Sequence, residues 1–461
     1  MKRSISKHRW YWLSVVVVLA APRLLAGQDA FPREEFEARR ERLFDKLGDN
    51  IGIVWGGFPS NEPVKFRQSP DLYYLCGIED PEVVLLLEGR SRTCYLFSRK
   101  PAERDERWEG ETVWSQPHFK RTYGVDSLMD FNSFWLMLSF LSQGRDSLYL
   151  PLTPIDGVKN DRGETNYYHF RNSFHPAQVT PYWVFAAHNI REKLPYTRLA
   201  DINPFLDSLR MLKSDYEISQ MKASGRIGAE GVKEAIRSSR PGMYEYELEA
   251  IASYHFTKAG ARGRAFAPIV PSGPNLYTIH YDANDRKIEE GDLVMMDYGC
   301  DYNYYTSDIT RTWPVSGKFS EADEKMYRCI LEARNAILDA MKPGVTLDSL
   351  RAVSQRVYEK HGFGDRALSW NNYLGHFVGL SVHDPGPYYR NVQLQAGMVF
   401  NVEPVLDDPA RKVHMRLEDT VLITEDGAVN LTADVPAELE EIYRLVNGEM
   451  KSSPLENGEN K

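Results

Sequence analysis

Two Asp residues set within an apolar strand pair constrain this chain more than any other feature of its sequence. Residues 294–298 and 304–313 are predicted strands because they are rich in Val, Met, Tyr and Trp, and residues 299–303 between them are turn-like. If the strands pair, Asp297 and Asp308 can lie close together. Directly opposed residues of a strand pair are ~5 Å apart, and like charges at that separation are destabilising. The pattern therefore calls for a counter-charge.

The same arrangement occurs again further along the chain. Residues 399–405 and 413–423 are predicted strands joined by a polar loop. They carry Glu403 and Glu418, which brings the number of carboxylates on the two strand pairs to four. A Gly- and His-rich segment, residues 375–386, lies between the two pairs in the sequence.

Clustered carboxylates of this kind are typical of a metal site. Four of them would raise one another's pKa or push the site apart, and two divalent cations would cancel their charge. Oxygen donors with a single imidazole suit Mn²⁺, Mg²⁺, Co²⁺ or Zn²⁺ better than a thiolate-preferring metal. Two such ions about 3.5–4 Å apart can generate hydroxide near neutral pH and hold it against a carbonyl. The alternative is that these acids are surface charges and that the histidine is structural.

Composition excludes several other classes of protein. The 461 residues carry 56 basic and 65 acidic side chains, a net charge of −9, so a general nucleic-acid-binding role is disfavoured. Neither a GxSxG nor an HExxH motif occurs, so a nucleophilic serine or a zincin site is not indicated. A zinc ribbon and a disulfide-dense scaffold are also excluded, because the four cysteines are far apart: Cys76, Cys94, Cys300 and Cys329.

The beginning of the chain resembles an export signal. Residues 10–21 are a short, mostly apolar run, and a membrane-spanning helix needs ~20 apolar residues. A positive start followed by a short apolar core is the layout of a secretory signal peptide, here residues 1–27. The alternative is an uncleaved N-terminal anchor, and either would place the body of the protein outside the cytosol, in the periplasm or secreted. The positive start consists of Lys2, Arg3, Lys7 and Arg9.

The rest of the sequence divides into two predicted domains and a tail. Residues 28–200 alternate strands with helical patterns and are expected to form an α/β domain. Residues 201–450 contain the two acidic strand pairs, and residues 451–461 form a polar tail that we expect to be disordered. Long helices in the second domain are predicted at residues 214–239, 245–259, 320–342 and 347–360. Ser214 and Glu217 have the spacing of a capping box at the start of the first of these helices.

Four segments resemble the metal-binding motifs of metallopeptidases with the pita-bread fold. They read MDYGCDYNYYTSDITRTWPVSG at 296–317, GHFVGLSVHDPG at 375–386, FNVEPV at 400–405 and MRLEDTVLIT at 415–424. Within that group the chain is most similar to Xaa-Pro aminopeptidases, with Xaa-Pro dipeptidases next. Residues 66–87 resemble the N-terminal domain of the aminopeptidases, and residues 210–232 resemble the start of their catalytic domain.

The resemblance implies a fold and a set of metal ligands. The fold is α+β, with a creatinase-like α/β domain before a C-terminal pita-bread catalytic domain. Asp308 and Glu418 would bridge two divalent ions, Asp297 would complete the coordination of one ion, and His376 with Glu403 that of the other. Manganese is the expected metal, with cobalt or zinc as alternatives. All five predicted ligands are present: Asp297, Asp308, His376, Glu403 and Glu418.

The resemblance also assigns three residues around the metal site. His280 would line the substrate site, His383 would contact the substrate near the scissile bond, and Arg416 would hold acidic ligands in place. One departure is visible, since Asn372 stands where the family often has another histidine. Three further histidines are expected to be structural or to lie at the surface: His255, His361 and His414.

The implied activity is hydrolysis of the peptide bond that precedes a proline at the second position of a peptide. A metal-bridging hydroxide would attack the carbonyl, with Glu403 as the proton carrier. Three alternatives stay open: an Xaa-Pro dipeptidase, a creatinase-like C–N hydrolase and a non-enzymatic binding module with the same fold. Members of the family are often dimers or tetramers, so a homo-oligomer is expected. Binding to nucleic acid is not expected.

Overall fold

The computed structural model describes residues 32–59, 65–153, 170, 180–367, 373–386 and 392–449. The predicted signal peptide, the predicted disordered tail and Asn372 lie outside these ranges, so the interpretations that rest on them stay predictions. None of the helices in the described ranges combines the length and the apolar content that a membrane span requires.

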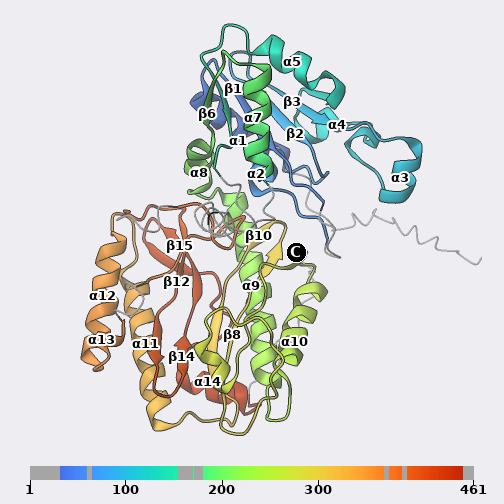
Figure 1. Cartoon of the computed structure of the whole chain (residues 1–461). Helices are drawn as coiled ribbons and strands as arrows, with labels where there is room; N and C mark the ends of the chain where they lie inside the picture. Colours follow the sequence, from blue (N-terminus) through green and yellow to red (C-terminus); the bar gives the residue numbers. More distant parts are fainter. Residues whose placement is uncertain are drawn as a thin grey trace, which may run out of the picture. The chain divides into compact units, whose positions relative to one another are not determined.

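The N-terminal part is built on one six-stranded sheet with the strand order β4-β3-β2-β1-β5-β6 (Figure 1). The central strands β1, β2 and β3 pair antiparallel, whereas β4, β5 and β6 each pair parallel with their neighbours. The strands are β1 (Ile51–Trp55), β2 (Val84–Glu88), β3 (Thr93–Ser98), β4 (Ser127–Asp130), β5 (Ser147–Leu150) and β6 (Arg198–Asp201).

Helices cover both faces of this sheet. Successive residues of a strand point to opposite faces, so buried residues next to each other in β1 contact helices on opposite sides. Ile51 and Ile53 pack in one apolar cluster with residues of α5 and α7. Gly52 faces the other way, where an added Cβ would lie 3.0 Å from the side chain of Leu47 in α1. The helices of this part are α1 (Arg33–Leu47), α2 (Pro70–Cys76), α3 (Glu103–Glu109), α4 (Phe119–Tyr123), α5 (Phe134–Leu141), α7 (Tyr182–Lys193) and α8 (Asn203–Arg210).

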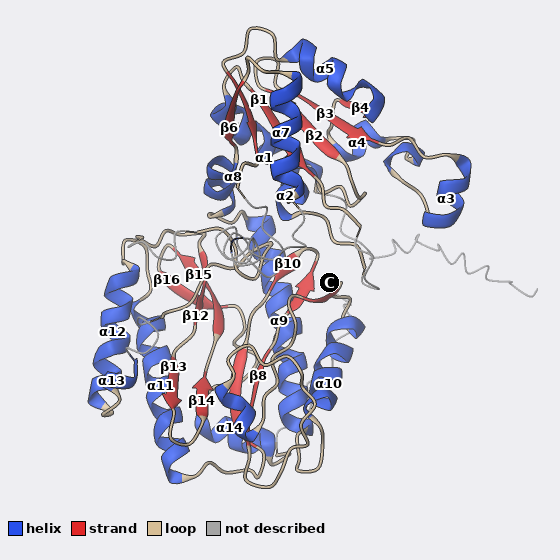
Figure 2. Cartoon of the chain, in the orientation of Figure 1, coloured by secondary structure: helices blue, strands red, loops and turns tan. Residues whose placement is uncertain are grey.

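The C-terminal part begins with α9 (Asp215–Ser238), and its start matches the predicted capping box. The Ser214 hydroxyl accepts from the backbone N–H of Glu217 at 3.3 Å, and the Glu217 carboxylate accepts from the N–H of Ser214 at 3.1 Å. Further helices follow, and Figure 2 shows them around the strands of this part. They are α10 (Glu245–Lys258), α11 (Glu321–Ala340), α12 (Leu347–Lys360) and α14 (Leu439–Val446), with the short α13 (Gly364–Ala367) after α12.

Short antiparallel sheets form the centre of the C-terminal part. One apolar cluster lies between them and the helices, with residues from α9, α10, α11 and α14. β8 pairs β11, β12 pairs β15, which pairs β16, and β13 pairs β14. The strands are β7 (Gly263–Arg264), β8 (Leu293–Asp297), β9 (Cys300–Tyr302), β10 (Tyr305–Thr306), β11 (Thr310–Pro314), β12 (Val399–Val402), β13 (Val405–Asp408), β14 (Val413–Arg416), β15 (Asp419–Thr424) and β16 (Gly427–Asn430).

The predicted strand 304–313 is interrupted in the structure, and the interruption contains Asp308. The chain turns at Asn303 and Tyr304, whose φ angles are 48° and 72°, and β10 and β11 are separated by residues 307–309. The backbone N–H of Asp308 donates to the hydroxyl of Thr420 at 3.1 Å instead of continuing a strand ladder. Alternating hydrophobicity cannot reveal such a break, because the residues on both sides of it are strand formers.

The second predicted strand pair is interrupted in the same way. The chain leaves β12 at Glu403 and resumes as β13 after Pro404, which has no N–H to offer a ladder. On the other side, β14 ends at Arg416 and β15 begins at Asp419, so Glu418 also lies in a break. Each break contains at least one predicted acidic ligand.

Candidate metal centre

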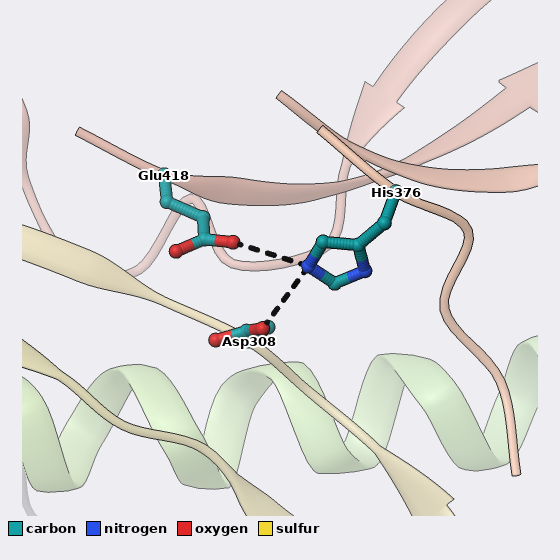
Figure 3. Close-up of side chains that lie close together, drawn as sticks. All are labelled: Asp308, His376 and Glu418. Atoms are coloured by element: carbon teal, nitrogen blue, oxygen red, sulfur yellow. Dashed lines mark ion pairs between the residues drawn. The ribbon is translucent and has the colours of Figure 1, made fainter. Parts of the chain in front are cut away.

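Three side chains from separate segments meet at the centre of the C-terminal part. Asp308, His376 and Glu418 each offer a ligand atom, and these atoms all lie within 4.8 Å of one another. The Nε2 atom of His376 is 3.4 Å from Asp308 Oδ2 and 3.6 Å from Glu418 Oε1, as Figure 3 shows. All three residues are buried. An isolated antiparallel β-bridge joins Thr310, the first residue of β11, to Glu418, which lies between β14 and β15.

The other two predicted ligands lie in the same cavity and are joined by Arg416. Its Nη1 donates to Glu403 Oε1 at 2.7 Å and its Nη2 to Asp297 Oδ2 at 2.6 Å. The guanidinium therefore forks between Asp297, the last residue of β8, and Glu403, which directly follows β12. The structure thus places all five predicted ligands around one cavity, with three in the compact group and two held by the arginine.

Neighbouring groups orient two of the three central side chains, Glu418 and His376. Glu418 accepts from the Thr310 hydroxyl at 2.6 Å and from the Asn401 amide at 2.7 Å. His376 Nδ1 lies 3.1 Å from the carbonyl oxygen of Phe377, which can only accept, so Nδ1 carries a proton. Against the effect of burial, hydrogen bonding to Asp308 and Glu418 raises the pKa of His376 well above its usual value, so Nε2 also carries a proton when no cation is bound. In the neutral imidazole that binds a metal ion, Nε2 has the lone pair, and it is the atom that faces the carboxylates.

Burial and mutual repulsion shift the pKa values of these acids. Burial, with the charges of Glu418 and Asp297, raises the pKa of Asp308 well above its usual value. Burial and the charge of Glu418 raise the pKa of Glu403 to about 7, even though Arg416 opposes the shift. The pKa of Glu418 is lowered, because hydrogen bonding to His376 and the charge of Arg416 outweigh its burial.

This donor set fits divalent cations. Among the described residues, the Oδ1 atom of Asp308 is buried with no hydrogen-bond partner, which is costly for a carboxylate oxygen unless a cation contacts it. Four carboxylates line the cavity with one guanidinium, that of Arg416, so negative charge is in excess. Oxygen donors with one imidazole suit the harder divalent ions.

The cavity around this group has a volume of about 230 Å³. His280, which follows the turn Gly273–Tyr277, and His383 both line it, as the resemblance implied for the substrate site. The rings of His383 and His376 are close, with centroids 4.1 Å apart. The roles of these side chains as ligands and substrate contacts stay predictions.

His414 also lines the cavity, although the sequence led us to interpret it as structural or surface. It is buried, and its Nδ1 lies 2.7 Å from Asp407 Oδ1, its register partner on β13. His414 precedes Arg416 by two positions on β14, so both point to the same face. That period-2 spacing was the available signal. Apolar cavity walls that sequence reasoning missed are Phe266, Ile269, Ile279, Tyr373, Val382 and Val405.

Comparisons with known proteins agree with this geometry. The model of metallopeptidase family M24 matches residues 219–425, and that of the aminopeptidase P N-terminal domain matches residues 36–149. The Xaa-Pro aminopeptidase of Escherichia coli is 31% identical over 447 residues, which cover 90% of this chain and 98% of that relative.

Solved structures show the same two-domain fold. A variant of Escherichia coli aminopeptidase P is 29% identical, has a TM-score of 0.78, and is matched over 91% of this chain and 99% of its own. A second variant, solved in complex with substrate, is 28% identical with a TM-score of 0.75, over 90% of this chain and 98% of its own. The predicted fold class is confirmed. The chain belongs to metallopeptidase family M24, with an aminopeptidase P N-terminal domain before its catalytic domain.

Proposed function

We propose that this chain is a metal-dependent aminopeptidase that hydrolyses the bond between the first residue of a peptide and a proline at the second position. The observation that carries the proposal is the meeting of Asp308, His376 and Glu418 in a buried cavity beside the Arg416 fork. Similarity to Xaa-Pro aminopeptidases over almost the whole chain supports it, and one similar structure contains substrate.

The five predicted ligands would hold two divalent ions. Asp308 and Glu418 would contact both ions, Asp297 one of them, and His376 with Glu403 the other. When bound, such ions acidify a water molecule and polarise the scissile carbonyl. We propose manganese as the native metal, since four carboxylates and one imidazole form a hard donor set.

Glu403 is suited to carry the proton. Its carboxylate lies in the cavity beside the other predicted ligands, where it can accept and release a proton. It would take the proton of the attacking water and deliver it to the proline nitrogen as the peptide bond breaks. Arg416 keeps the carboxylate in place during both transfers, because it holds Glu403 and Asp297 at once.

The histidines of the cavity would stabilise the negative charge that develops on the oxygen of the scissile carbonyl. An imidazole N–H of His383 or His280 can donate to the carbonyl oxygen as negative charge develops there. Such a donor is most effective when it is already oriented before the reaction. The closeness of the His383 and His376 rings shows that His383 lies beside the predicted ligands.

The cavity walls are suited to a proline ring. Proline has no backbone N–H, and its ring fixes φ. A peptidase that depends on that N–H or on an extended strand therefore rejects proline. The apolar side chains of Phe266, Tyr373 and Val382 offer a shaped surface for the ring instead.

Peptide hydrolysis with controlled metal content tests the proposal. The purified protein is stripped with a chelator and assayed on Ala-Pro-Ala, Ala-Pro and Ala-Ala-Ala, before and after Mn²⁺ is added. We expect release of alanine from Ala-Pro-Ala only with metal, and no cleavage of Ala-Ala-Ala. Cleavage of Ala-Pro alone would make the protein a dipeptidase, and full activity of the stripped protein would contradict the proposal.

Two further proposals concern where and in what form the enzyme acts. We propose export through residues 1–27, because their positive start and short apolar run have the layout of a signal peptide. Mass spectrometry of the N-terminus from the exported fraction would show a chain that starts after this segment, and a retained Met1 in the cytosol would contradict export. We also propose a homo-oligomer, which light scattering on the purified protein would detect.

A further inference from the structure

Four buried charged side chains lie next to the loop that carries His383, and we call them the anchoring cluster: Asp71, Arg210, Lys213 and Asp384. Arg210 donates through Nη1 to Asp71 Oδ1 at 2.9 Å and through Nη2 to Asp384 Oδ1 at 2.6 Å. Lys213 Nζ donates to Asp384 Oδ2 at 2.9 Å. No side chain of the cluster is more than 2% exposed. Two cations and two anions balance, so the cluster itself carries no net charge.

Asp384 makes hydrogen bonds within the loop that carries His383, in addition to its ion pairs with Arg210 and Lys213. Its Oδ1 accepts from the backbone N–H of Ser381 at 3.2 Å, and its own N–H donates to the carbonyl of Phe377 at 2.9 Å. A Cβ added at Gly379 would lie 2.5 Å from Asp384 Oδ2, so the carboxylate fills the space that a side chain there would need. The loop is thereby held from both sides.

The position of Asp384 links two histidines of the cavity. It directly follows His383, and its backbone N–H bonds to Phe377, the residue after His376. The ring of His383 is held 4.1 Å from that of His376 at the other end of the same loop. A shift of the Asp384 carboxylate would therefore move His383 relative to the predicted metal ligand.

The other three members of the anchoring cluster come from outside the catalytic segment that the M24 family model matches. Arg210 is the last residue of α8, Lys213 lies between α8 and α9, and both precede residue 219, where the match begins. Asp71 is in the first turn of α2, within the aminopeptidase P N-terminal domain. The hydroxyl of Tyr74 in α2 donates to the carbonyl of Leu209 at 3.0 Å, which fixes α8 against α2.

We propose that Arg210 and Lys213 are positioning residues that hold His383 in its reactive place through Asp384. Neither cation lines the cavity, so both act through the loop and not on the substrate. Burial of four charges is expensive, and removing one partner leaves another charge buried without compensation. The inference rests on the proposed function, in which His383 faces the scissile bond.

A double-mutant cycle separates positioning from general stability. In the metal-loaded enzyme, we expect Asp384→Asn to lower kcat on Ala-Pro-Ala at least tenfold. In a His383→Ala background the same change should cost less than twofold, because the side chain that Asp384 positions is already gone. An equal loss in both backgrounds would overturn the proposal. Lys213→Met serves as a second variant if Asp384→Asn fails to fold.

A matched control comes from the N-terminal sheet. Glu88 is also a buried carboxylate that pairs with an arginine, Arg145, but it lies in β2 and outside the cavity. Glu88→Gln should lower thermal stability without a change in kcat. A tenfold fall in kcat for this variant as well would mean that destabilisation alone explains the effect.

The position of His383 can also be followed without catalysis. In metal-free protein with ¹⁵N-labelled histidine, the His383 resonance is identified by its absence from His383→Ala. We expect it to shift in Asp384→Asn and Lys213→Met and to stay in place in Glu88→Gln. No shift in the first two variants would overturn the positioning role. If the wild type cleaves no Xaa-Pro peptide, the proposed function fails, yet this measurement still decides whether the cluster positions His383.

Discussion

At the scale of single residues, Arg416 and Glu403 explain how an excess of buried negative charge is held together. Arg416 neutralises one charge and donates to one oxygen of Glu403 and to one oxygen of Asp297, while burial raises the pKa of Glu403. An arginine is required for this arrangement, because a lysine offers a point charge and cannot fork between two planar groups.

Replacing Glu403 by Gln should abolish hydrolysis while the fold persists. The amide keeps the size of the side chain but can neither accept nor release a proton, and general acid–base catalysis is worth about 10²–10⁴ in rate. We expect kcat on Ala-Pro-Ala to fall by at least about 10² by that principle. Unchanged near-ultraviolet circular dichroism is the control, and turnover at the wild-type rate would contradict the proton-carrying role.

Arg416→Lys should weaken metal binding. Loss of the fork lets Glu403 and Asp297 move apart, and disturbance of groups that orient ligands typically costs 10–100-fold in metal affinity. Titration of the stripped protein with Mn²⁺ in a calorimeter measures this. Arg411→Lys is the matched control, because Arg411 lies between β13 and β14 of the same hairpin but pairs with Asp323 and Asp408 outside the cavity. Equal affinities of the two variants would argue against the fork.

At the scale of elements, three of the predicted ligands lie where a strand is interrupted. Asp308 lies between β10 and β11, Glu403 between β12 and β13, and Glu418 between β14 and β15. A residue in a regular strand must share the alternation of its neighbours, whereas a residue at a break can point across the sheet. The interruptions allow side chains from two strand pairs to reach one cavity.

Gly375 is a second local requirement, because it lets the segment before His376 approach β12. Its φ is +139°, and an added Cβ would lie 1.9 Å from the carbonyl oxygen of Asn401. Gly375→Ala should lower the free energy of unfolding by more than about 3 kcal/mol and weaken metal binding, by steric conflict at a fixed backbone. Urea unfolding measures the first effect.

Gly362→Ala provides the comparison for this variant. Gly362 has a φ of +77° and nothing within 4 Å of an added Cβ, so it carries only the backbone penalty of about 1–2 kcal/mol. A Gly375→Ala variant no less stable than Gly362→Ala would show that the predicted clash is relieved.

The sequence predicted the elements of the site better than their interruptions. The apolar alternation around Asp297 and Glu403 indicated strands, and Ser214 with Glu217 marked the start of α9 within a residue. The breaks at Asp308 and Glu418 depend on hydrogen bonds to Thr420 and Thr310, which are remote in sequence. The sequence did contain a signal for His414, because its spacing of two from Arg416 places both side chains on one face of β14.

At the scale of the whole molecule, buried ion pairs join elements that are distant in the sequence. Asp419, next to Glu418, accepts from Arg311 of β11 and from Arg334 of α11, and it is fully buried. Against the effect of burial, these two guanidinium groups lower its pKa to about 2 from an ordinary 3.8. Together with the anchoring cluster, these contacts tie helices to the sheets that carry the site.

Stability at low pH should report on Asp419. A folded-state pKa below the unfolded value contributes stability that is present above about pH 4 and lost as pH falls toward 2. Asp419→Asn should therefore cost about 3–5 kcal/mol at pH 7, the usual cost of breaking a buried pair. The difference from wild type should narrow between about pH 4 and 2, as urea unfolding of both metal-free proteins would show. A difference independent of pH would contradict this.

The central claim is that Asp297, Asp308, His376, Glu403 and Glu418 together hold two divalent ions. Metal content of the purified, dialysed protein by mass spectrometry, for the wild type and Asp308→Asn, tests it most directly. We predict two equivalents of metal per chain in the wild type and a clear loss in the variant, whose bridging carboxylate is removed. A wild type that cleaves Ala-Pro-Ala at full rate with less than a tenth of an equivalent of metal would contradict the claim.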